Sequence, residues 1–305
     1  MGKVSVAEIK ELMKSTGVGM MDCKKALEAN DGDMDKAIEF LREKGLATQA
    51  KKSGRAAAEG IVTAVVNGNV GVLLEVNTET DFAANTDDIK NFVNAVANTI
   101  VEKNPADVEA LKAETISGGT TTVGEALTEL AGMKIRENIV IRRFVRMEGV
   151  LASYIHNGGS IGVMVKLDTA LSADQAAPIG KDVAMQSAAL NAPYLKREDV
   201  PAEVVEKEKE IMLAQMSEDP KMASKPEKVK EGIINGKINK FYTENCLLEQ
   251  AFVKDDKVSV KGYVDAEAKK LGGTITVTDV VRFERGEGVE KKDDNLADEV
   301  AKMIK

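Results

Sequence analysis

The sequence has one histidine, two cysteines and no tryptophan, and aromatic residues make up only 4% of it. Because His156 is the one histidine, a Ser–His–Asp or Cys–His catalytic arrangement would have to form around that single residue. Cys23 and Cys246 lie far apart, and neither belongs to a Cys-x-x-Cys motif, which argues against a zinc site and a disulfide framework. The scarcity of aromatic side chains predicts a core built from aliphatic residues.

Motifs of nucleotide-binding enzymes, metal sites and membrane proteins are also missing. There is no GxxxxGK(S/T) motif, no GxGxxG that follows a strand and opens a helix, and no metal-spaced cluster of His, Cys, Asp and Glu. No apolar run approaches the roughly 20 residues that span a bilayer, and residues 1–14 lack the apolar region of a signal peptide. We therefore expect a cytoplasmic protein that is not an enzyme and binds no cofactor, metal ion or membrane.

The charge balance is acidic, with a net charge of −8. An acidic protein is poorly suited to bind free nucleic acid as its main ligand, because phosphate binding needs a basic surface. Lys51, Lys52 and Arg55 form a local basic segment, so a nucleic-acid-associated role stays open as an alternative.

The first 45 residues have the pattern of three short helices. Ser5 followed by Glu8 is a capping box in front of an apolar helical stripe. Asp22 can cap a second helix and Asp33 a third, and Gly45 can end the third helix. Residues 46–58 then form a helical or flexible linker.

An internal repeat organises the middle of the chain. Residues 59–62 (EGIV) match residues 148–151 (EGVL) at an offset of 89, and residues 70–72 match residues 161–163 at an offset of 91. Residues 59–62 and 70–72 belong to the two strands of a first β-hairpin, and residues 148–151 and 161–163 to those of a second. Asn67-Gly68 is a strong hairpin signal in the first of them. The repeat therefore predicts two related α+β halves.

Helices and a strand are expected around these hairpins. Asp87 can cap a helix after the first hairpin, Thr122 and Glu125 form another capping box, and a helix from about Ser172 to Leu190 follows the second hairpin. Between the halves, a strand with alternating character is expected. Its two sides are Ile139, Ile141 and Val145 on one face and Val140, Arg142 and Phe144 on the other.

The C-terminal third differs in composition from the segments before it. Pro201 starts a charged helix, and a second charged helix follows a Pro-rich turn, which predicts a projecting helical hairpin. The chain then returns with a helix over 260–271 and a strand over 274–283. After the Gly-rich hinge 286–288, a last helix carries Leu296, Val300 and Met303.

Three places could bind a partner, and each has a plainer interpretation. Phe82 lies beside an acid in an exposed connection of the segment 78–82, but it could instead pack a helix start onto the core while Thr80 or Asp81 caps that helix. Met20 and Met21 lie in the turn between the first two helices, and could be either core filling or adaptable binding surface.

His156 is either a polar turn residue or a contact residue. The turn after it, residues 157–159 (NGG), leads into a strand, so it lacks the helix dipole that favours anion binding.

Several motifs in consistent order resemble the elongation factor Ts family over essentially the whole chain. They are residues 16–27 (TGVGMMDCKKAL), 80–83 (TDFA), 137–138 (EN) with 141–143 (IRR), 154–157 (YIHN) and 282–288 (RFERGEG). The resemblance implies an α+β protein of four parts. These are a ubiquitin-associated-like three-helix module with its linker (1–55), a core N-subdomain (56–147), a core C-subdomain with a helical hairpin inserted at about 196–241 (148–285), and a C-terminal helical module (286–305).

The resemblance also implies a function, namely guanine nucleotide exchange on elongation factor Tu, bound in its GDP-loaded and nucleotide-free forms. Three groups of contact residues carry over from the family: Asp81, Phe82, Ala83 and Ala84 at the partner's Mg²⁺ site, Met20, Met21 and Lys24 in the N-terminal module, and His156 in the second core half. The C-terminal helix is a further contact. A homodimer or a 2:2 complex with the partner stays open.

Two positions depart from the family pattern. Met13 stands where some relatives have a basic contact residue, and Arg136 stands where glycine is common, so a different local backbone is expected at Arg136. The main alternative function is that of a peptide-binding or scaffold protein built on a ubiquitin-associated-type module.

Overall fold

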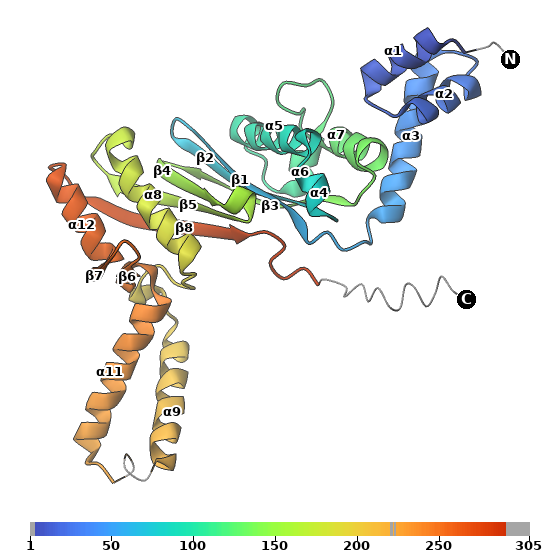
Figure 1. The fold of residues 1–305 in the computed structure, drawn as a ribbon. Coiled ribbons are helices and arrows are strands. Elements are labelled where there is room, and N and C mark those ends of the chain that lie inside the picture. The colour runs from blue at the N-terminus through green and yellow to red at the C-terminus, as the bar shows by residue number, and fades with distance from the viewer. Residues whose placement is uncertain (1–3, 220–221, 223, 291–305) are drawn as a thin grey trace.

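In the computed structural model, residues 4–219, 222 and 224–290 are described, and they form an α+β fold. A helical module lies at one end, a core with two three-stranded antiparallel sheets lies in the middle, and a helical hairpin projects from the other side of the core (Figure 1). No helix in this part of the chain combines the length and the apolar character needed to cross a bilayer. The predicted C-terminal helix falls mainly on residues 291–305, which lie outside the described residues.

The N-terminal module consists of α1 (Val6–Thr16), α2 (Met20–Ala29) and α3 (Met34–Lys52). The capping box of Ser5 and Glu8 is confirmed, and Asp33 caps α3 as expected. Buried aliphatic side chains from all three helices form a small core, which Met133 of the central core completes. The module is thus packed against the rest of the protein through its own hydrophobic core.

The prediction that Gly45 ends the third helix is wrong, because α3 continues to Lys52. Gly45 is buried where α3 crosses the π-helical turn η1 (Leu130–Lys134), and a Cβ on Gly132 would lie 2.3 Å from the Gly45 carbonyl oxygen. The two glycines therefore allow the backbones of α3 and η1 to approach closely. Gly45 does not have the left-handed φ of a glycine that ends a helix.

The start of the second helix was also predicted wrongly. Gly19 is the N-cap residue of α2, with an extended backbone and no side-chain cap bond. Met20 and Met21 therefore form the first turn of the helix and do not lie in the preceding turn. Asp22 caps nothing, because its carboxylate pairs with Lys44 and Arg136.

The first sheet has the strand order β1-β2-β3 and is antiparallel throughout. Its elements and the helices on its outer face are β1 (Glu59–Asn67), β2 (Val70–Thr78), β3 (Ile139–Glu148), α5 (Asp87–Lys103), α6 (Val108–Ala113) and α7 (Val123–Glu129). The predicted hairpin is confirmed, with its two-residue loop one position later than expected, at Gly68-Asn69. The capping box of Thr122 and Glu125 is confirmed, whereas Thr86 rather than Asp87 caps α5.

The side-chain alternation predicted for β3 is wrong in its second half. A bulge leaves Arg142 without a partner position on β2, since Val76 pairs with Ile141 and the next residue, Glu75, pairs with Arg143. An extra residue reverses the faces of everything after it. Phe144 consequently packs with Ile141 in the hydrophobic cluster between the first sheet and the helices that cover it.

The second sheet repeats this plan with the order β4-β5-β8. Its elements and the helices packed on it are β4 (Val150–His156), β5 (Ile161–Thr169), β8 (Ile275–Glu284), α8 (Ala173–Ala189) and α12 (Val260–Lys270). A short pair, β6 (Ala251–Phe252) and β7 (Asp255–Ser259), was not predicted. The expected helix after the second hairpin is confirmed, and Ser172 caps it.

The two sheets pack against each other through a hydrophobic cluster that includes Leu73 of the first sheet and Met164 of the second. Glycines allow the two sheets to approach closely. A Cβ on Gly71 would lie 2.7 Å from Leu151 Cδ1, and a Cβ on Gly162 would lie 2.5 Å from Val62 Cγ1. Both glycines occupy the same position of the internal repeat. Gly60 and Gly149 are a second such pair, with φ values of 130° and 136°.

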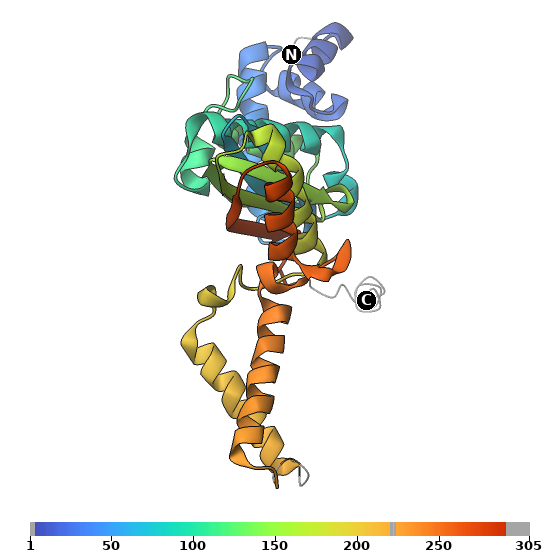
Figure 2. The same ribbon diagram turned by 90° about the vertical axis from the view of Figure 1, so that its left-hand side faces the viewer.

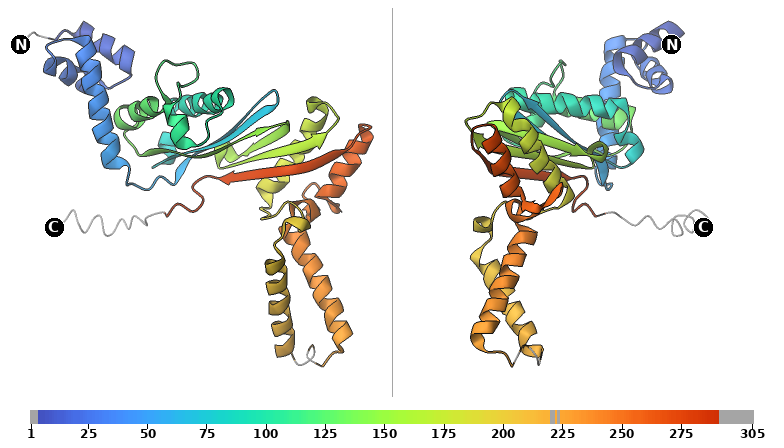
Figure 3. Two further views of the ribbon diagram at one scale, coloured as in Figure 1. Left: turned by 180° about the vertical axis from the view of Figure 1, so that it is seen from behind. Right: turned by 60° about the vertical axis from the view of Figure 1, so that its left-hand side comes forward.

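The helical hairpin consists of α9 (Ala202–Glu218) and α11 (Glu227–Asn245), and it extends away from the core in every view (Figures 2 and 3). A narrow apolar seam between the two helices includes Met216, Ile234 and Ile238. Most of its remaining surface is exposed, as expected for two charged helices.

A buried carboxylate ties the first sheet to the chain beyond β8. Glu75 has no exposed surface and accepts hydrogen bonds from Arg142 Nη1 (3.0 Å), Arg143 Nε (2.6 Å) and Gly286 N (2.8 Å). Gly286 has a φ of 69°, and a Cβ there would lie 2.1 Å from the Ala58 carbonyl oxygen. The Gly-rich segment is thus a fixed turn at this joint.

Candidate functional site

A four-residue helix, α4 (Asp81–Ala84), follows β2 directly and carries the first group of predicted contact residues. Thr80 is its N-cap, and Thr80 Oγ1 accepts a hydrogen bond from Ala83 N (3.2 Å). Ala83 and Ala84 are buried, because their small side chains let the turn lie close to β1 and β2. Asp81 is exposed, and the Phe82 side chain is 84% exposed.

The exposure of Phe82 decides between its two interpretations. A phenylalanine that anchored the helix start to the core would be buried, so the packing interpretation is wrong. Leaving this ring in water forgoes about 2 kcal/mol of hydrophobic stabilisation. No contact within the described fold offsets this exposure, and α4 therefore presents an apolar ring beside a carboxylate.

Polar contacts hold the start of α4 in place. Glu137 Oε2 accepts from Thr80 N (3.0 Å), and Glu137 Oε1 accepts from Thr80 Oγ1 (2.8 Å). The Thr78 hydroxyl donates to the Thr80 carbonyl oxygen (2.8 Å). The N-cap of α4 is therefore fixed by a carboxylate from the chain just before β3.

The second group lies on α2, where Met20 is 50% and Met21 64% exposed. Neither fills the module's core, so the core-filling interpretation is wrong. Lys24 is one helical turn further along, and its ammonium lies 3.6 Å from the Glu28 carboxylate. The three side chains offer two flexible apolar groups and one positive charge.

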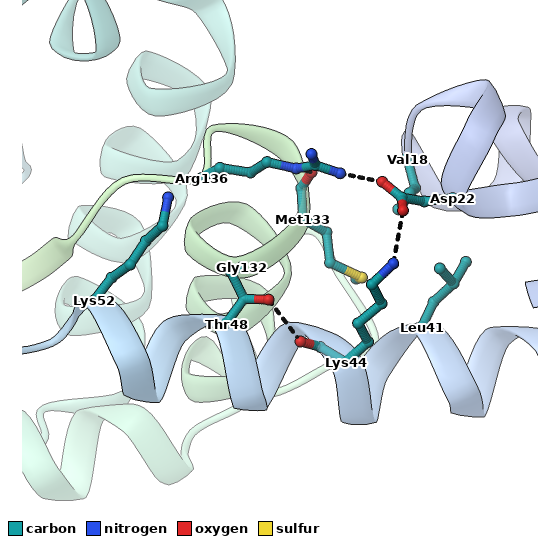
Figure 4. Close-up of a pocket in the computed structure, with 9 residues that line it drawn as sticks. All are labelled: Val18, Asp22, Leu41, Lys44, Thr48, Lys52, Gly132, Met133 and Arg136. Carbon is teal, nitrogen blue, oxygen red and sulfur yellow. Dashed lines mark hydrogen bonds and ion pairs between the residues drawn. The ribbon is translucent and has the colours of Figure 1, made fainter. Parts of the chain in front are cut away.

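Asp22 anchors the same helix to the core. Lys44 Nζ lies 2.7 Å from Asp22 Oδ1, and the Arg136 guanidinium donates to Oδ2 (Figure 4). Lys44, and to a smaller degree Arg136, hold the pKa of Asp22 below its usual range. These residues line a cavity of about 300 Å³ between α2, α3 and η1.

Arg136 has an unusual backbone. Its φ of 61° lies in the left-handed region, which glycine adopts freely and other residues adopt at a cost of about 1 to 2 kcal/mol. The chain thus keeps a glycine-like conformation at this position although the residue is arginine. Its side chain reaches Asp22, a contact that glycine could not make.

His156 ends β4 and is exposed, and its Nδ1 lies 3.0 Å from the Tyr154 hydroxyl. The following turn packs on β1, since a Cβ on Gly159 would lie 2.9 Å from Ile61 Cγ2. As predicted, this turn leads into a strand and not into a helix.

Strand register brings the His156 turn and α4 to the same end of the first hairpin. Glu59, at the start of β1, pairs with Thr78, the last residue of β2 before α4. The His156 turn packs two residues further along β1. Figure 1 shows α2 and α4 toward the end of the molecule that carries α3.

The residues that support these elements could not be assigned a role from the sequence. Glu137 and Asn138 were noted as a motif, and Arg136 as a departure, but their partners lie 57 to 114 residues away in the chain. Periodicity and capping patterns carry no information over such separations.

Groups of side chains that could bind a metal ion are a further kind of candidate site. Across the part of the chain that the structure describes, no group of three or more His, Cys, Asp and Glu side chains could hold a metal ion.

Comparisons with known proteins point to one family. A family model described as Elongation factor TS matches residues 79–287. Proteins named Elongation factor Ts from Trichlorobacter lovleyi and Syntrophotalea carbinolica are both 48% identical to the chain, covering 98% and 99% of it and 97% and 100% of themselves. A protein of the same name from Magnetococcus marinus is 44% identical, over 99% of each chain. The family match includes α4, and the relatives extend it over the N-terminal helices.

Proposed function

Because the chain belongs to the elongation factor Ts family, we propose that it is a guanine nucleotide exchange factor for the GTPase elongation factor Tu. It binds the GDP-loaded and nucleotide-free forms of that partner in the cytoplasm and promotes GDP release without covalent chemistry. The observation that carries the proposal is the fixed, outward presentation of Phe82 beside Asp81 on α4.

The proposed mechanism rests on thermodynamic linkage. In such GTPases, Mg²⁺ and a backbone cradle neutralise the phosphates of the nucleotide. A protein that binds the nucleotide-free form more tightly than the loaded form must weaken nucleotide binding by the same factor. The exchange factor therefore needs contacts that are compatible only with a disturbed phosphate and Mg²⁺ site.

We assign that role to α4. Phe82 is the wedge, because an 84% exposed ring can be buried in an apolar gap of the partner at no cost to its own fold. Burying it stabilises the complex by about 2 kcal/mol, or about thirtyfold. Asp81 places a negative charge near the partner's Mg²⁺ site, and Ala83 and Ala84 form the close-packed base of the wedge.

The other exposed residues are assigned to docking. Met20 and Met21 provide adaptable apolar surface and Lys24 a charge, while His156 lies at the α4 end of the first hairpin. Docking residues lower the concentration of exchange factor at which exchange reaches half of its maximal rate. The wedge sets the maximal rate, that is, how fast GDP leaves once the complex has formed.

Release of a fluorescent GDP from elongation factor Tu, followed by stopped flow, tests this proposal. We expect strong acceleration by the wild-type chain and a loss of about thirtyfold in maximal rate for Phe82→Ala. Leu271→Ala is the matched control, because Leu271 is 40% exposed but lies at the end of α12, away from α4 (Figure 1).

Acceleration that is equal for wild type and Phe82→Ala would keep the exchange function and reject the wedge. No acceleration by the wild-type chain would reject the exchange function itself.

A further inference from the structure

We propose that three consecutive residues, Arg136, Glu137 and Asn138, form a positioning segment that fixes the two partner-facing helices, α2 and α4, relative to each other. The inference deepens the proposed exchange function and rests on it. Each residue of the segment bonds to a different element, so that one short piece of chain connects the docking helix, the wedge helix and the linker between them.

Arg136 makes the connection to α2. Its guanidinium pairs with Asp22, which lies one and two residues after Met21 and Met20. Lys44 of α3 holds the other oxygen of the same carboxylate (2.7 Å), so Asp22 joins α2 to both α3 and the core (Figure 4). The left-handed backbone of Arg136 directs the chain out of η1 so that this contact can form.

Glu137 makes the connection to α4. Both of its carboxylate oxygens accept hydrogen bonds from Thr80, one from the backbone N–H and one from the hydroxyl. Thr80 Oγ1 in turn accepts from Ala83 N. Bonds to a charged acceptor are about twice as strong as neutral ones. Glu137 therefore fixes the residue immediately before Asp81 and Phe82.

Asn138 makes the connection to the linker between α3 and β1. Asn138 is 5% exposed, and Nδ2 donates to the carbonyl oxygens of Arg55 (2.7 Å) and Ser53 (3.4 Å). Its backbone N–H donates to Glu79 Oε1 (2.5 Å), and Arg55 pairs with the other oxygen of Glu79 (3.4 Å). The linker and the end of β2 are thus held together under the segment.

The arrangement has a consequence for function. Neighbouring Cα atoms are about 3.8 Å apart, so a displacement of this segment moves the supports of α2 and α4 together. A partner that must engage Met20 and Met21 while receiving Phe82 requires a set spacing between the two helices. Holding that spacing in the free protein lowers the entropy lost on binding.

Single substitutions separate the two connections. Arg136→Ala removes the ion pair that ties α2 to the core and leaves α4 in place, so it raises the factor concentration for half-maximal exchange by about tenfold with the maximal rate nearly unchanged. Glu137→Ala frees the N-cap of α4, so it lowers the maximal rate by about tenfold with half-saturation nearly unchanged. Thr80→Val resembles Glu137→Ala, and Thr80→Ser, which keeps the hydroxyl, restores the rate.

Arg197→Ala and Glu249→Ala are the matched controls. They truncate another partly exposed arginine–carboxylate pair, at the base of the helical hairpin, and leave both exchange parameters unchanged. Equal changes in both parameters for Arg136→Ala and Glu137→Ala, or changes no larger than those of the controls, overturn the proposal.

A second readout does not depend on exchange. Spin labels are attached at Ala29→Cys on α2 and Asn94→Cys on α5, two exposed positions, while the native Cys23 and Cys246 are buried. The distance between the labels has a narrow distribution in the wild type and in Arg197→Ala, and it broadens in Arg136→Ala. A distribution that stays narrow in Arg136→Ala overturns the inference, whereas failure of wild-type exchange alone rejects the proposed function.

Discussion

Replacing Glu75 with glutamine removes the charge from a carboxylate that has no exposed surface. Removing one partner of a fully buried ion pair costs about 3 to 5 kcal/mol, because the remaining charge is left without a counter-charge. Here the Arg142 and Arg143 side chains are 25% and 32% exposed, so water can compensate part of that loss. We expect Glu75→Gln to lower the free energy of unfolding by about 2 to 3 kcal/mol.

The pH dependence gives this prediction a sign. Burial by itself would raise the pKa of Glu75, but the hydrogen bonds from Gly286 N–H, Arg143 and Arg142 outweigh it and hold the pKa below the ordinary value of 4.5. A lowered folded-state pKa stabilises the fold above pH 4.5, and that contribution is lost as the pH falls through the folded-state value. The difference between wild type and Glu75→Gln is therefore largest near neutral pH.

Urea unfolding followed by circular dichroism, at pH 7 and at steps below pH 4.5, measures this difference. Glu148→Gln is the control, because Glu148 pairs with Arg146 on the surface with 58% of its side chain exposed, and it changes stability by less than about 0.5 kcal/mol. If Glu75→Gln cost no more than Glu148→Gln at pH 7, the buried ion-pair network would not exist in solution.

Three further predictions concern packing, capping and thiol reactivity. Gly162→Ala lowers stability by about 1 to 3 kcal/mol, since its Cβ meets Val62, whereas Gly232→Ala on exposed α11 raises it by about 0.5 to 1 kcal/mol, and thermal unfolding measures both. Thr122→Ala removes a helix cap and costs about 1 kcal/mol in the same assay, while Thr122→Ser does not. Burial raises the pKa of Cys246 to about 11, so a thiol reagent at pH 8 modifies it only after unfolding, and fast modification of the native protein would contradict its burial.

Sequence patterns predicted the elements of this fold best where the deciding partner is close in the chain. The capping boxes at Ser5 and Thr122 were found because both halves of each lie within one helical turn. The bulge at Arg142 was not predicted because it depends on the register of β3 against β2. The role of Gly45 was predicted wrongly because it depends on a close contact with η1, which lies far along the chain. At these positions the contacts with distant residues decide the structure, and local sequence rules contain no information about them.

The candidate site shows the same limit. The segment around Phe82 could be identified as unusual, yet its exposure depends on how α4 lies on β1 and β2. The contacts of Arg136 and Glu137 span 114 and 57 residues, so no pattern of neighbouring residues indicates them. The family's preference for glycine at position 136 led to the expectation of a different local backbone, and that expectation is wrong, because Arg136 adopts a left-handed φ of 61° that glycine also favours.

The glycine contacts between the two sheets have the character of an isologous interface, the kind found in two-fold symmetric dimers. Across the joint, Gly162 approaches Val62 and Leu73, and Gly71 approaches their repeat counterparts Leu151 and Met164, so each of these contacts is made twice. In a dimer such an interface would weaken on dilution, whereas here the connecting chain keeps both halves at a fixed effective concentration. The same symmetry means that neither half can enlarge its side chains at this joint without displacing the other, although the two positions are 91 residues apart.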